Sequence, residues 1–360
     1  MNTTRKLQSG DFAPWFKAPA LEGSPAYTFD SVAGRYVLML FFGSANFEGS
    51  STALALVQRH RRLFDDSRAC FFGVSIDPQD VQQERIKKQI PGIRFFLDYD
   101  REVSALYGAS SSGRYDPFWV LLDPALRVLG TYSITDGAQA LRSLDEHLQQ
   151  PFVDNAWAPV LLVPNVFEPQ MCNHLIKLYE KQGSEVSGFM RDVGGTTVHV
   201  LDATHKRRRD HIIEDRTLQQ ALLARIRRRL LPSVRRSLQF EATRIERYIV
   251  ACYEAGAGHF RPHRDNTTKG TAHRRFAVTI NLNGEYEGGD LRFPEFGPRT
   301  YRAPVGGAIV FSCSLLHEAT PVLAGRRFAF LPFLYDEAGA AVRAANNASL
   351  ADASRHYRTN

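Results

Sequence analysis

The spacing of apolar residues changes near residue 150, and no single sheet or helical bundle accommodates both patterns. Before that point, short apolar runs such as residues 36–42 alternate with helical periods, as in a mostly parallel sheet with helices on both faces. From Tyr248 onward, short strands are separated by Gly, Pro and Asn, a pattern typical of a β-sandwich or barrel. The helical pattern stops at Gln149-Gln150-Pro151, because proline cannot continue a helix.

A chain of 360 residues is too long for one ordinary core and is long enough for two domains. We predict an α/β domain over residues 1–150 and an α+β domain over residues 151–337. Residues 338–360 are rich in Ala, Asn and Ser and are expected to form a fraying C-terminal tail.

The predicted elements follow from the local periods. In the first domain we expect strands near 36–42, 70–76, 94–97, 119–122 and 128–132, and helices near 53–64, 81–89 and 137–148. In the second we expect a strand at 160–163, a helix from Pro169, a helix over 218–234 broken at Pro232, and strands at 278–282, 291–293, 308–312 and 328–333.

The composition excludes several classes of protein. Apolar residues make up 44% and charged residues 23% of the chain, which excludes wholesale disorder. The longest apolar runs are too short to cross a bilayer, and the N-terminus is polar, so we expect neither export nor a membrane partner. Four widely spaced cysteines without a CxxC pair disfavour a disulfide scaffold or a zinc ribbon, and the cytoplasm is the expected location.

Basic residues are concentrated in the second half of the chain. Residues 1–150 carry 16 basic and 17 acidic side chains, against 45 and 38 in the whole chain. The excess includes residues 206–209 and arginines between residues 225 and 236. Clustered arginines can neutralise nucleic-acid phosphates, but no nucleic-acid motif accompanies them, and a solvated helix face is the alternative. A nucleic-acid partner is disfavoured but stays open.

Three candidate metal ligands stand in the second half. His263 and Asp265 are two residues apart, on one face of an extended segment. His317 follows 52 residues after Asp265, at the end of an apolar run. Two imidazoles and one carboxylate with open positions opposite form the facial triad of non-haem Fe(II) oxygenases. An isolated His-x-Asp triplet is by itself a weak signal, since most are surface coincidences.

Arg327 lies ten residues after His317 in a strand-like run. A guanidinium inside an apolar barrel requires a planar anion, and a carboxylate is its bidentate partner. The alternative is a surface arginine, Arg326 or Arg327, paired with a neighbour such as Glu318. Beside the triad, we interpret Arg327 as a ligand-binding residue.

Several segments together resemble the prolyl 4-hydroxylase-type Fe(II)/2-oxoglutarate dioxygenases, in the right order over residues 158–336. They are residues 253–265 (YEAGAGHFRPHRD), 281–283 (NLN), 288–294 (GGDLRFP), 304–308 (PVGGA), His317, 321–322 (PV) and 325–327 (GRR). The resemblance implies a double-stranded β-helix, or jelly roll, with Fe(II) held by His263, Asp265 and His317. It further implies 2-oxoglutarate as co-substrate with its distal carboxylate on Arg327, release of succinate and CO2, and L-ascorbate as reductant.

Two hydroxyl-bearing residues are candidates for binding the co-substrate. Tyr253 matches the family's hydroxyl-bearing position before the His-x-Asp segment, and Thr279 lies in the following strand. Either could instead be a core residue whose hydroxyl bonds the backbone. Phe260 departs from the family, because many relatives carry tyrosine there, so that hydrogen bond to the co-substrate is missing or supplied elsewhere.

Three further histidines compete for the metal role. His259 alternates with the His-x-Asp strand and is expected to point away from iron, and His205 is a third imidazole of the domain. His273 lies in a polar connection, where the open alternatives are a solvated loop and a loop that selects the substrate.

The first domain resembles the AhpC/TSA branch of the peroxiredoxins, which have a thioredoxin-like α/β fold, over about residues 8–148. The segments that carry the resemblance are residues 10–16, 40–52 and 117–123, in which Pro117 matches the thioredoxin-type cis proline. The family's loop carries Pro, Thr and Cys where this chain has Ser44, Glu48 and Ser51. A hydroxyl cannot replace the thiolate nucleophile, so we expect a domain without peroxidase activity that docks substrate, dimerises or shields the oxygenase.

The leading interpretation is therefore a 2-oxoglutarate-dependent dioxygenase that hydroxylates an amino-acid, peptide or protein side chain, with a prolyl side chain as one option. The partners expected are a small molecule or a peptide or protein, with homodimerisation as an option. Two alternatives remain: a non-catalytic binding or scaffold protein built from two degenerate domains, and an oxygenase that acts on nucleic acid.

Overall fold

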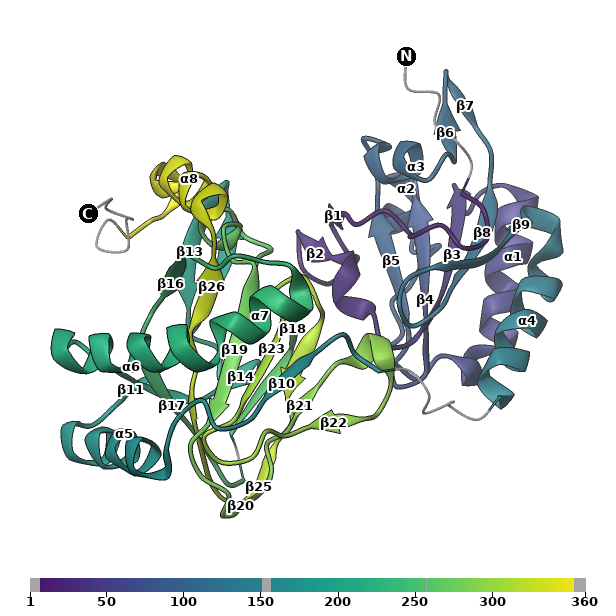
Figure 1. The fold of residues 1–360 in the computed structure, drawn as a ribbon. Helices are drawn as coiled ribbons and strands as arrows, with labels where there is room; N and C mark the ends of the chain where they lie inside the picture. The colour runs from purple at the N-terminus through teal and green to yellow at the C-terminus, as the bar shows by residue number, and fades with distance from the viewer. Residues whose placement is uncertain (1–6, 151–156, 257, 353–360) are drawn as a thin grey trace. The chain divides into compact units, whose positions relative to one another are not determined.

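The computed structural model describes residues 7–150, 157–256 and 258–352 (Figure 1). It divides into two compact units. One unit contains the described residues before Trp157 together with Pro294–Gly297, and the other contains the rest. The predicted junction at Pro151 lies outside the described residues.

A five-stranded sheet forms the centre of the first unit, in the order β5-β4-β3-β8-β9. Its strands are β3 (Tyr36–Gly43), β4 (Ala69–Ser75), β5 (Ile93–Leu97), β8 (Phe118–Leu122) and β9 (Val128–Ser133). The pairs β3–β4 and β4–β5 are parallel, whereas β3–β8 and β8–β9 are antiparallel. The prediction of a mostly parallel sheet was wrong in this half, because the short link between β8 and β9 makes a hairpin and leaves no room for a crossover.

Aromatic side chains cover both faces of this sheet by strict alternation along β3. Phe42 packs in one core beneath α1 (Glu48–Arg59) and α4 (Gly137–Gln149), which lie side by side (Figure 1). Phe41 points the other way and contacts Tyr107, with ring centroids 5.0 Å apart. The alternation explains why a continuous apolar run predicts a strand buried on both faces.

One helix expected in this unit was wrong in its bounds, and one proline that matches the family motif differs from it in its peptide bond. The helix expected over residues 81–89 ends early, as α2 (Gln79–Gln82), because Glu84 adopts a left-handed backbone with φ of 50°. Pro117 does not follow a cis peptide bond: among the described residues the cis bond is Ile90–Pro91. A motif match identifies a proline, but the isomer depends on the local turn.

Two larger antiparallel sheets and a two-stranded sheet of β12 (Phe189–Val193) and β13 (Thr196–Val200) lie in the second unit. The larger contains the path β10-β23-β19-β25-β17-β15-β11, and the smaller has the order β14-β18-β24-β21-β22. The strands of the larger path are β10 (Leu161–Val163), β11 (Glu185–Val186), β15 (Arg209–Ile212), β17 (Ile249–Glu254), β19 (Phe276–Asn281), β23 (Ala308–Ser312) and β25 (Val322–Phe330). Those of the smaller are β14 (Lys206–Arg207), β18 (His259–His263), β21 (Leu291–Arg292), β22 (Thr300–Tyr301) and β24 (His317–Ala319).

Three helices pack their apolar stripes on the larger sheet. They are α5 (Pro169–Gln182), α6 (Arg216–Arg229) and α7 (Leu231–Leu238). Leu222, Ile226 and Val234 are fully buried in the same core as Val250 of β17. The break between α6 and α7 falls at the predicted Pro232, which occupies the first turn of α7, where a missing N–H is tolerated.

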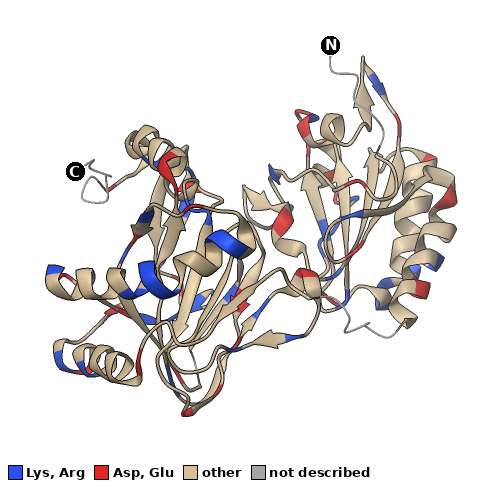
Figure 2. Cartoon of the chain, viewed as in Figure 1, with Lys and Arg blue, Asp and Glu red and all other residues tan. Residues whose placement is uncertain are grey.

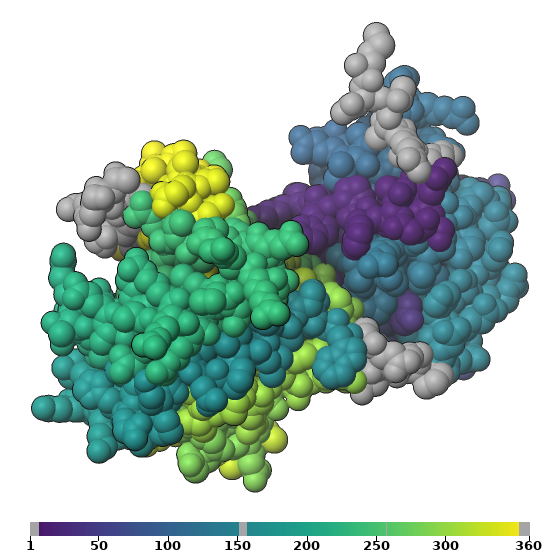
Figure 3. Space-filling view, in the orientation of Figure 1, coloured from purple at the N-terminus to yellow at the C-terminus, as the bar shows by residue number. Residues whose placement is uncertain are grey.

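The expectation of a fraying tail from residue 338 was wrong over its first part. Residues Glu337–Ala345 form α8, which lies on the surface of its unit (Figure 3). The side chain of Asp336 accepts a hydrogen bond from the Gly339 N–H at 2.8 Å and caps the helix. The alanines of this segment favour a helix once it is capped. No helix in the described part of the chain is long and apolar enough to cross a membrane.

Candidate active site

His263, Asp265 and His317 lie together in the second unit. His263 ends β18 and is the direct partner of His317, which begins β24. One ligand atom from each of the three side chains lies within 4.8 Å of the others. Asp265 Oδ1 is 3.6 Å from His263 Nε2, and Asp265 Oδ2 is 3.3 Å from His317 Nε2. The strand pairing thus brings a ligand from 52 residues away beside the His-x-Asp segment.

Backbone carbonyls orient both imidazoles. His263 Nδ1 is 2.8 Å from the carbonyl of Arg261, and His317 Nδ1 is 3.0 Å from that of Leu315. An imidazole nitrogen facing a carbonyl must carry the proton, which leaves the Nε2 lone pair as the ligand. Phe260 stacks on the face of the His263 ring, with ring centroids 3.4 Å apart, and so restrains the orientation of that ring.

Two of the three groups, His263 and Asp265, are held in the protonation states that a metal requires. Burial and the neighbouring His317 lower the pKa of His263 to about 4. Burial alone would raise the pKa of Asp265, but His317 and His263 outweigh it and hold that pKa well below its usual value. At neutral pH the site therefore offers a neutral imidazole at position 263 and a carboxylate, the forms that bind metal.

Arg327, Tyr253 and Thr279 form a second group on the larger sheet. Tyr253 of β17 is the direct partner of Arg327 of β25, and the guanidinium carbon lies 5.3 Å from the centroid of the tyrosine ring. Arg327 Nη2 donates to Thr279 Oγ1 at 3.1 Å. The buried Nε of Arg327 has no hydrogen-bond partner among the described residues. A buried guanidinium with a free donor is a ready site for a carboxylate.

Glu318, the alternative partner considered for Arg327, forms its ion pair with another residue. Glu318 pairs with Arg292, and the neighbouring Arg326 pairs with Glu180 on the surface at 2.8 Å. Arg327 instead faces an apolar cluster that contains Tyr253, Phe260, Ala319 and Val322. Its environment differs from that of Arg326 because successive residues of β25 point to opposite faces.

The basic run at residues 206–209 is not a solvated helix face, and that prediction was wrong for Lys206 and Arg208. The run forms β14 and the start of β15. Lys206 is buried and donates to Ser187 Oγ at 2.7 Å. Arg208 is buried in a bidentate pair with Asp210, at 2.7 and 2.6 Å, and its Nη1 donates to the hydroxyl of Tyr253 at 3.3 Å.

The sequence did carry a signal for Arg208, because Arg208 and Asp210 are two residues apart in an extended segment and therefore lie on the same face. The arginines that follow behave differently. Arg225 and Arg229 of α6 both pair with Glu168, at 2.8 and 2.6 Å, and basic residues are spread along α6 and α7 (Figure 2).

The competing histidines lie outside the ligand group. His273 is not in a solvated loop: it is buried, its Nε2 lies 2.8 Å from Glu246 Oε2, and Glu246 also pairs with Arg274 at 2.7 Å. His205 packs on Phe189 with centroids 4.6 Å apart. His259 Nε2 lies 3.3 Å from the carbonyl of Thr204. Glu246 and Arg274 were not singled out from the sequence, because nothing local distinguishes a buried pair from surface charges.

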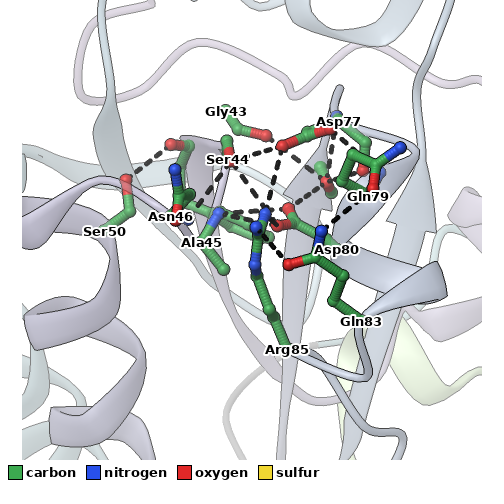
Figure 4. A network of polar contacts seen from close by, with 12 residues as sticks. Gly43, Ser44, Ala45, Asn46, Ser50, Asp77, Gln79, Asp80, Gln83 and Arg85 are labelled. Atoms are coloured by element: carbon green, nitrogen blue, oxygen red, sulfur yellow. Dashed lines mark hydrogen bonds and ion pairs between the residues drawn. The ribbon is translucent and has the colours of Figure 1, made fainter.

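The loop after β3 in the first unit is held by a polar network (Figure 4). Asp80 is fully buried and accepts from the Ala45 N–H at 3.0 Å and from Ser75 Oγ at 2.7 Å. Ser44 Oγ donates to Asp77 Oδ2 at 2.6 Å, and Ser51 Oγ donates to the carbonyl of Glu48 at 2.9 Å. The hydroxyl at position 51 thus bonds its own helix turn.

No thiol takes the place of the missing nucleophile. Cys70 lies in the middle of the sheet, and burial raises the pKa of its thiol to about 12. A thiol with so high a pKa is not a nucleophile at neutral pH.

Comparisons with known proteins match the two units separately. Residues 9–132 match the model of the AhpC/TSA family, and residues 248–335 match that of the 2OG-Fe(II) oxygenase superfamily. Both sequence resemblances are thereby confirmed. The first unit is thus a thioredoxin-like α/β domain, and the second is a mixed domain rich in strands.

Several curated relatives are PKHD-type hydroxylases. One from Synechococcus is 27% identical over 124 residues, which is 32% of this chain and 53% of the relative, so the chain spans about half of that protein's length. One from Shewanella baltica is 28% identical over 188 residues, 48% of this chain and 76% of the relative. A solved prolyl-4-hydroxylase from Pseudomonas putida is 17% identical, covers 50% of this chain and 94% of its own, and has a TM-score of 0.39.

Proposed function

We propose that the chain is a 2-oxoglutarate-dependent dioxygenase, because residues 248–335 match the model of the 2OG-Fe(II) oxygenase superfamily and residues 9–132 match that of the AhpC/TSA family. It hydroxylates an amino-acid, peptide or protein side chain, prolyl among the candidates, and releases succinate and CO2. The observation that carries the proposal is the convergence of three ligand atoms within 4.8 Å of one another.

His263, Asp265 and His317 are the residues that hold Fe(II). Two imidazoles and one carboxylate are the donor set of the facial triad, which leaves positions for co-substrate and oxygen. The fit is supported by the orientation of both Nε2 atoms, since each Nδ1 is bonded to a carbonyl. When bound, the metal supplies the activation of oxygen, with L-ascorbate as the reductant that keeps it ferrous.

Arg327 binds the distal carboxylate of 2-oxoglutarate. Its unpaired Nε supports this role, as does the apolar cluster around it. Thr279 holds the guanidinium through Oγ1. The hydroxyl of Tyr253 accepts from Arg208, so its own hydrogen remains available to donate to the carboxylate.

The architecture proposed for this domain is a double-stranded β-helix over residues 151–337. Two antiparallel sheets support it, one carrying His263 on β18 and His317 on β24, and the other carrying Tyr253, Thr279 and Arg327. For the domain over residues 1–150, we propose a non-peroxidatic role in docking substrate, dimerisation or shielding of the oxygenase. Four free, buried cysteines support a cytoplasmic location.

The experiment is a succinate-release assay with Fe(II), 2-oxoglutarate and ascorbate. We expect uncoupled turnover in the wild type and none in His263→Ala. The matched control is His259→Ala, which removes an imidazole from the same strand without touching the ligand group. Turnover that persists in His263→Ala would refute the assigned ligands. Binding of Mn(II) to the same variants gives a second readout that does not depend on turnover.

A further inference from the structure

Arg247 has an unusual backbone in a position beside the active site. It lies between β16 (Arg244–Glu246) and β17, with φ of 56°. A left-handed backbone is uncommon for a residue other than glycine and persists only where the surroundings hold it. Its Nε donates to the carbonyl of Leu331 at 3.1 Å. The strained turn therefore holds the side chain in a defined position.

The guanidinium of Arg247 is connected to the backbone of a proposed metal ligand through Phe333 and Arg274. Its central carbon lies over the ring of Phe333, 4.2 Å from the centroid, and that of Arg274 lies over the same ring at 4.0 Å. Arg274 Nη1 in turn donates to the backbone carbonyl of Asp265 at 3.3 Å. The carbonyl that Arg247 bonds belongs to Leu331, which packs against the apolar cluster that contains Phe260, and Phe260 stacks on His263.

Arg247 differs from the other buried arginines in its charge balance. Arg208 pairs with Asp210, and Arg274 pairs with Glu246. In the described part of the chain, no carboxylate forms an ion pair with Arg247. Burial, Arg274 and Arg208 lower its pKa to about 10, although Glu246 and Asp210, which pair with Arg274 and Arg208, act to raise it, so it is still charged at neutral pH. A desolvated cation beside two others is costly unless an anion neutralises it.

The co-substrate does not account for this charge. Arg327 stands opposite Tyr253, near the end of β17, whereas Arg247 precedes the start of the same strand. At about 3.3 Å per residue, the six residues between positions 247 and 253 separate their backbones by up to roughly 20 Å. One short dicarboxylate on Arg327 therefore leaves Arg247 unneutralised.

We propose that Arg247 binds a carboxylate of the substrate and so selects a substrate that carries a carboxylate near the carbon to be hydroxylated. The inference rests on the proposed function, because it assigns the substrate class of the same site. The planar fork of a guanidinium matches a carboxylate bidentately. The alternative is that Arg247 acts only as a structural partner of Phe333 and Leu331.

The test compares probes with and without the carboxylate. The full chain is loaded with Fe(II) and 2-oxoglutarate. It is then given one of three sets of probes: N-acetylated amino acids as free acids, the same compounds as C-terminal amides, or single-stranded oligonucleotides. We expect at least one free acid, and not its amide, to stimulate succinate formation in the wild type. In Arg247→Gln its half-saturating concentration should rise roughly 30-fold or more, as for a lost buried charge pair, with partial recovery in Arg247→Lys.

The uncoupled rate and the KM for 2-oxoglutarate should change less than about twofold in Arg247→Gln, which excludes general damage and a co-substrate role. Calorimetric titration of the same probes into the Mn(II)-loaded protein measures the preference for the free acid over the amide without turnover. If the wild type makes no succinate, the proposed function fails, and calorimetry alone decides the role of Arg247. Equal effects of acids and amides, stimulation by oligonucleotides alone, or a raised KM for 2-oxoglutarate in Arg247→Gln would each overturn the inference.

Discussion

Arg327 lies directly opposite Tyr253 on the neighbouring strand, and its guanidinium carbon is 5.3 Å from the centroid of the tyrosine ring. The pairing places a buried cation with a free Nε donor beside a hydroxyl and an apolar wall. Leaving this buried cation unpaired costs free energy, and binding of a carboxylate offsets that cost.

Arg327→Gln should therefore weaken 2-oxoglutarate binding. Losing a buried charge-assisted pair costs about 2 kcal/mol or more, which is roughly a 30-fold rise in the half-saturating concentration. Calorimetric titration of 2-oxoglutarate into the Mn(II)-loaded protein measures it. Arg326→Gln is the matched control, because Arg326 pairs with Glu180 at the surface, and it should behave as the wild type. Equal losses in both variants would contradict the assignment.

Metal binding should depend on pH in a way that follows from His263. Its pKa is lowered to about 4, so the folded protein keeps this imidazole neutral at and above pH 6. Mn(II) affinity should change little between pH 8 and 6 and should fall as the pH approaches 4, because protons then compete for the ligand. Electron paramagnetic resonance of free Mn(II) reports the binding. A steep loss of affinity near pH 6.5 would contradict the prediction.

The same shift predicts how the metal-free protein responds to acid. Between pH 6.5 and 4 the unfolded chain binds a proton at His263 that the folded chain does not. The free energy of unfolding should therefore fall as the pH is lowered through this range. Urea unfolding of the wild type and of His263→Ala compares the slopes, and the variant should show the smaller dependence.

Glu246→Gln should destabilise the second unit. Burial acts to raise the pKa of Glu246, but Arg274 and His273 outweigh it and hold the pKa well below its usual value. Removing this carboxylate leaves Arg274 buried without its partner, at a cost of about 3–5 kcal/mol. Urea unfolding measures the loss. Glu254→Gln removes an exposed carboxylate from the neighbouring strand and should cost less than about 0.5 kcal/mol.

The native protein should show no rapidly reacting thiol. All four cysteines are buried, and burial raises the pKa of Cys70 to about 12 and those of Cys172 and Cys252 to about 11. Titration with a disulfide reagent at pH 8 should therefore release thiol only after denaturation. Ser51→Cys, at an exposed position, should add one fast-reacting thiol and serves as the positive control. A fast thiol in the wild type would contradict the prediction.

Much of the fold could be predicted from local patterns. The alternation along β3 and the proline between α6 and α7 are properties of neighbouring residues, so periodicity and backbone chemistry suffice to place them. Two elements were mispredicted although their causes are close in sequence: β9 pairs antiparallel to β8 because of a short link, and α8 forms because Asp336 caps it.

The sequence alone determined the types of candidate ligand and their order along the chain, since His263, Asp265, His317 and Arg327 are recognised by residue type and spacing. The tertiary structure decided which charges are buried and which are paired. Arg208 forms an ion pair with Asp210, whereas Arg247 forms none with the described carboxylates. Burial and pairing depend on strands that are distant in the chain, and the free energy of a charge depends on those surroundings more than on its neighbours in sequence.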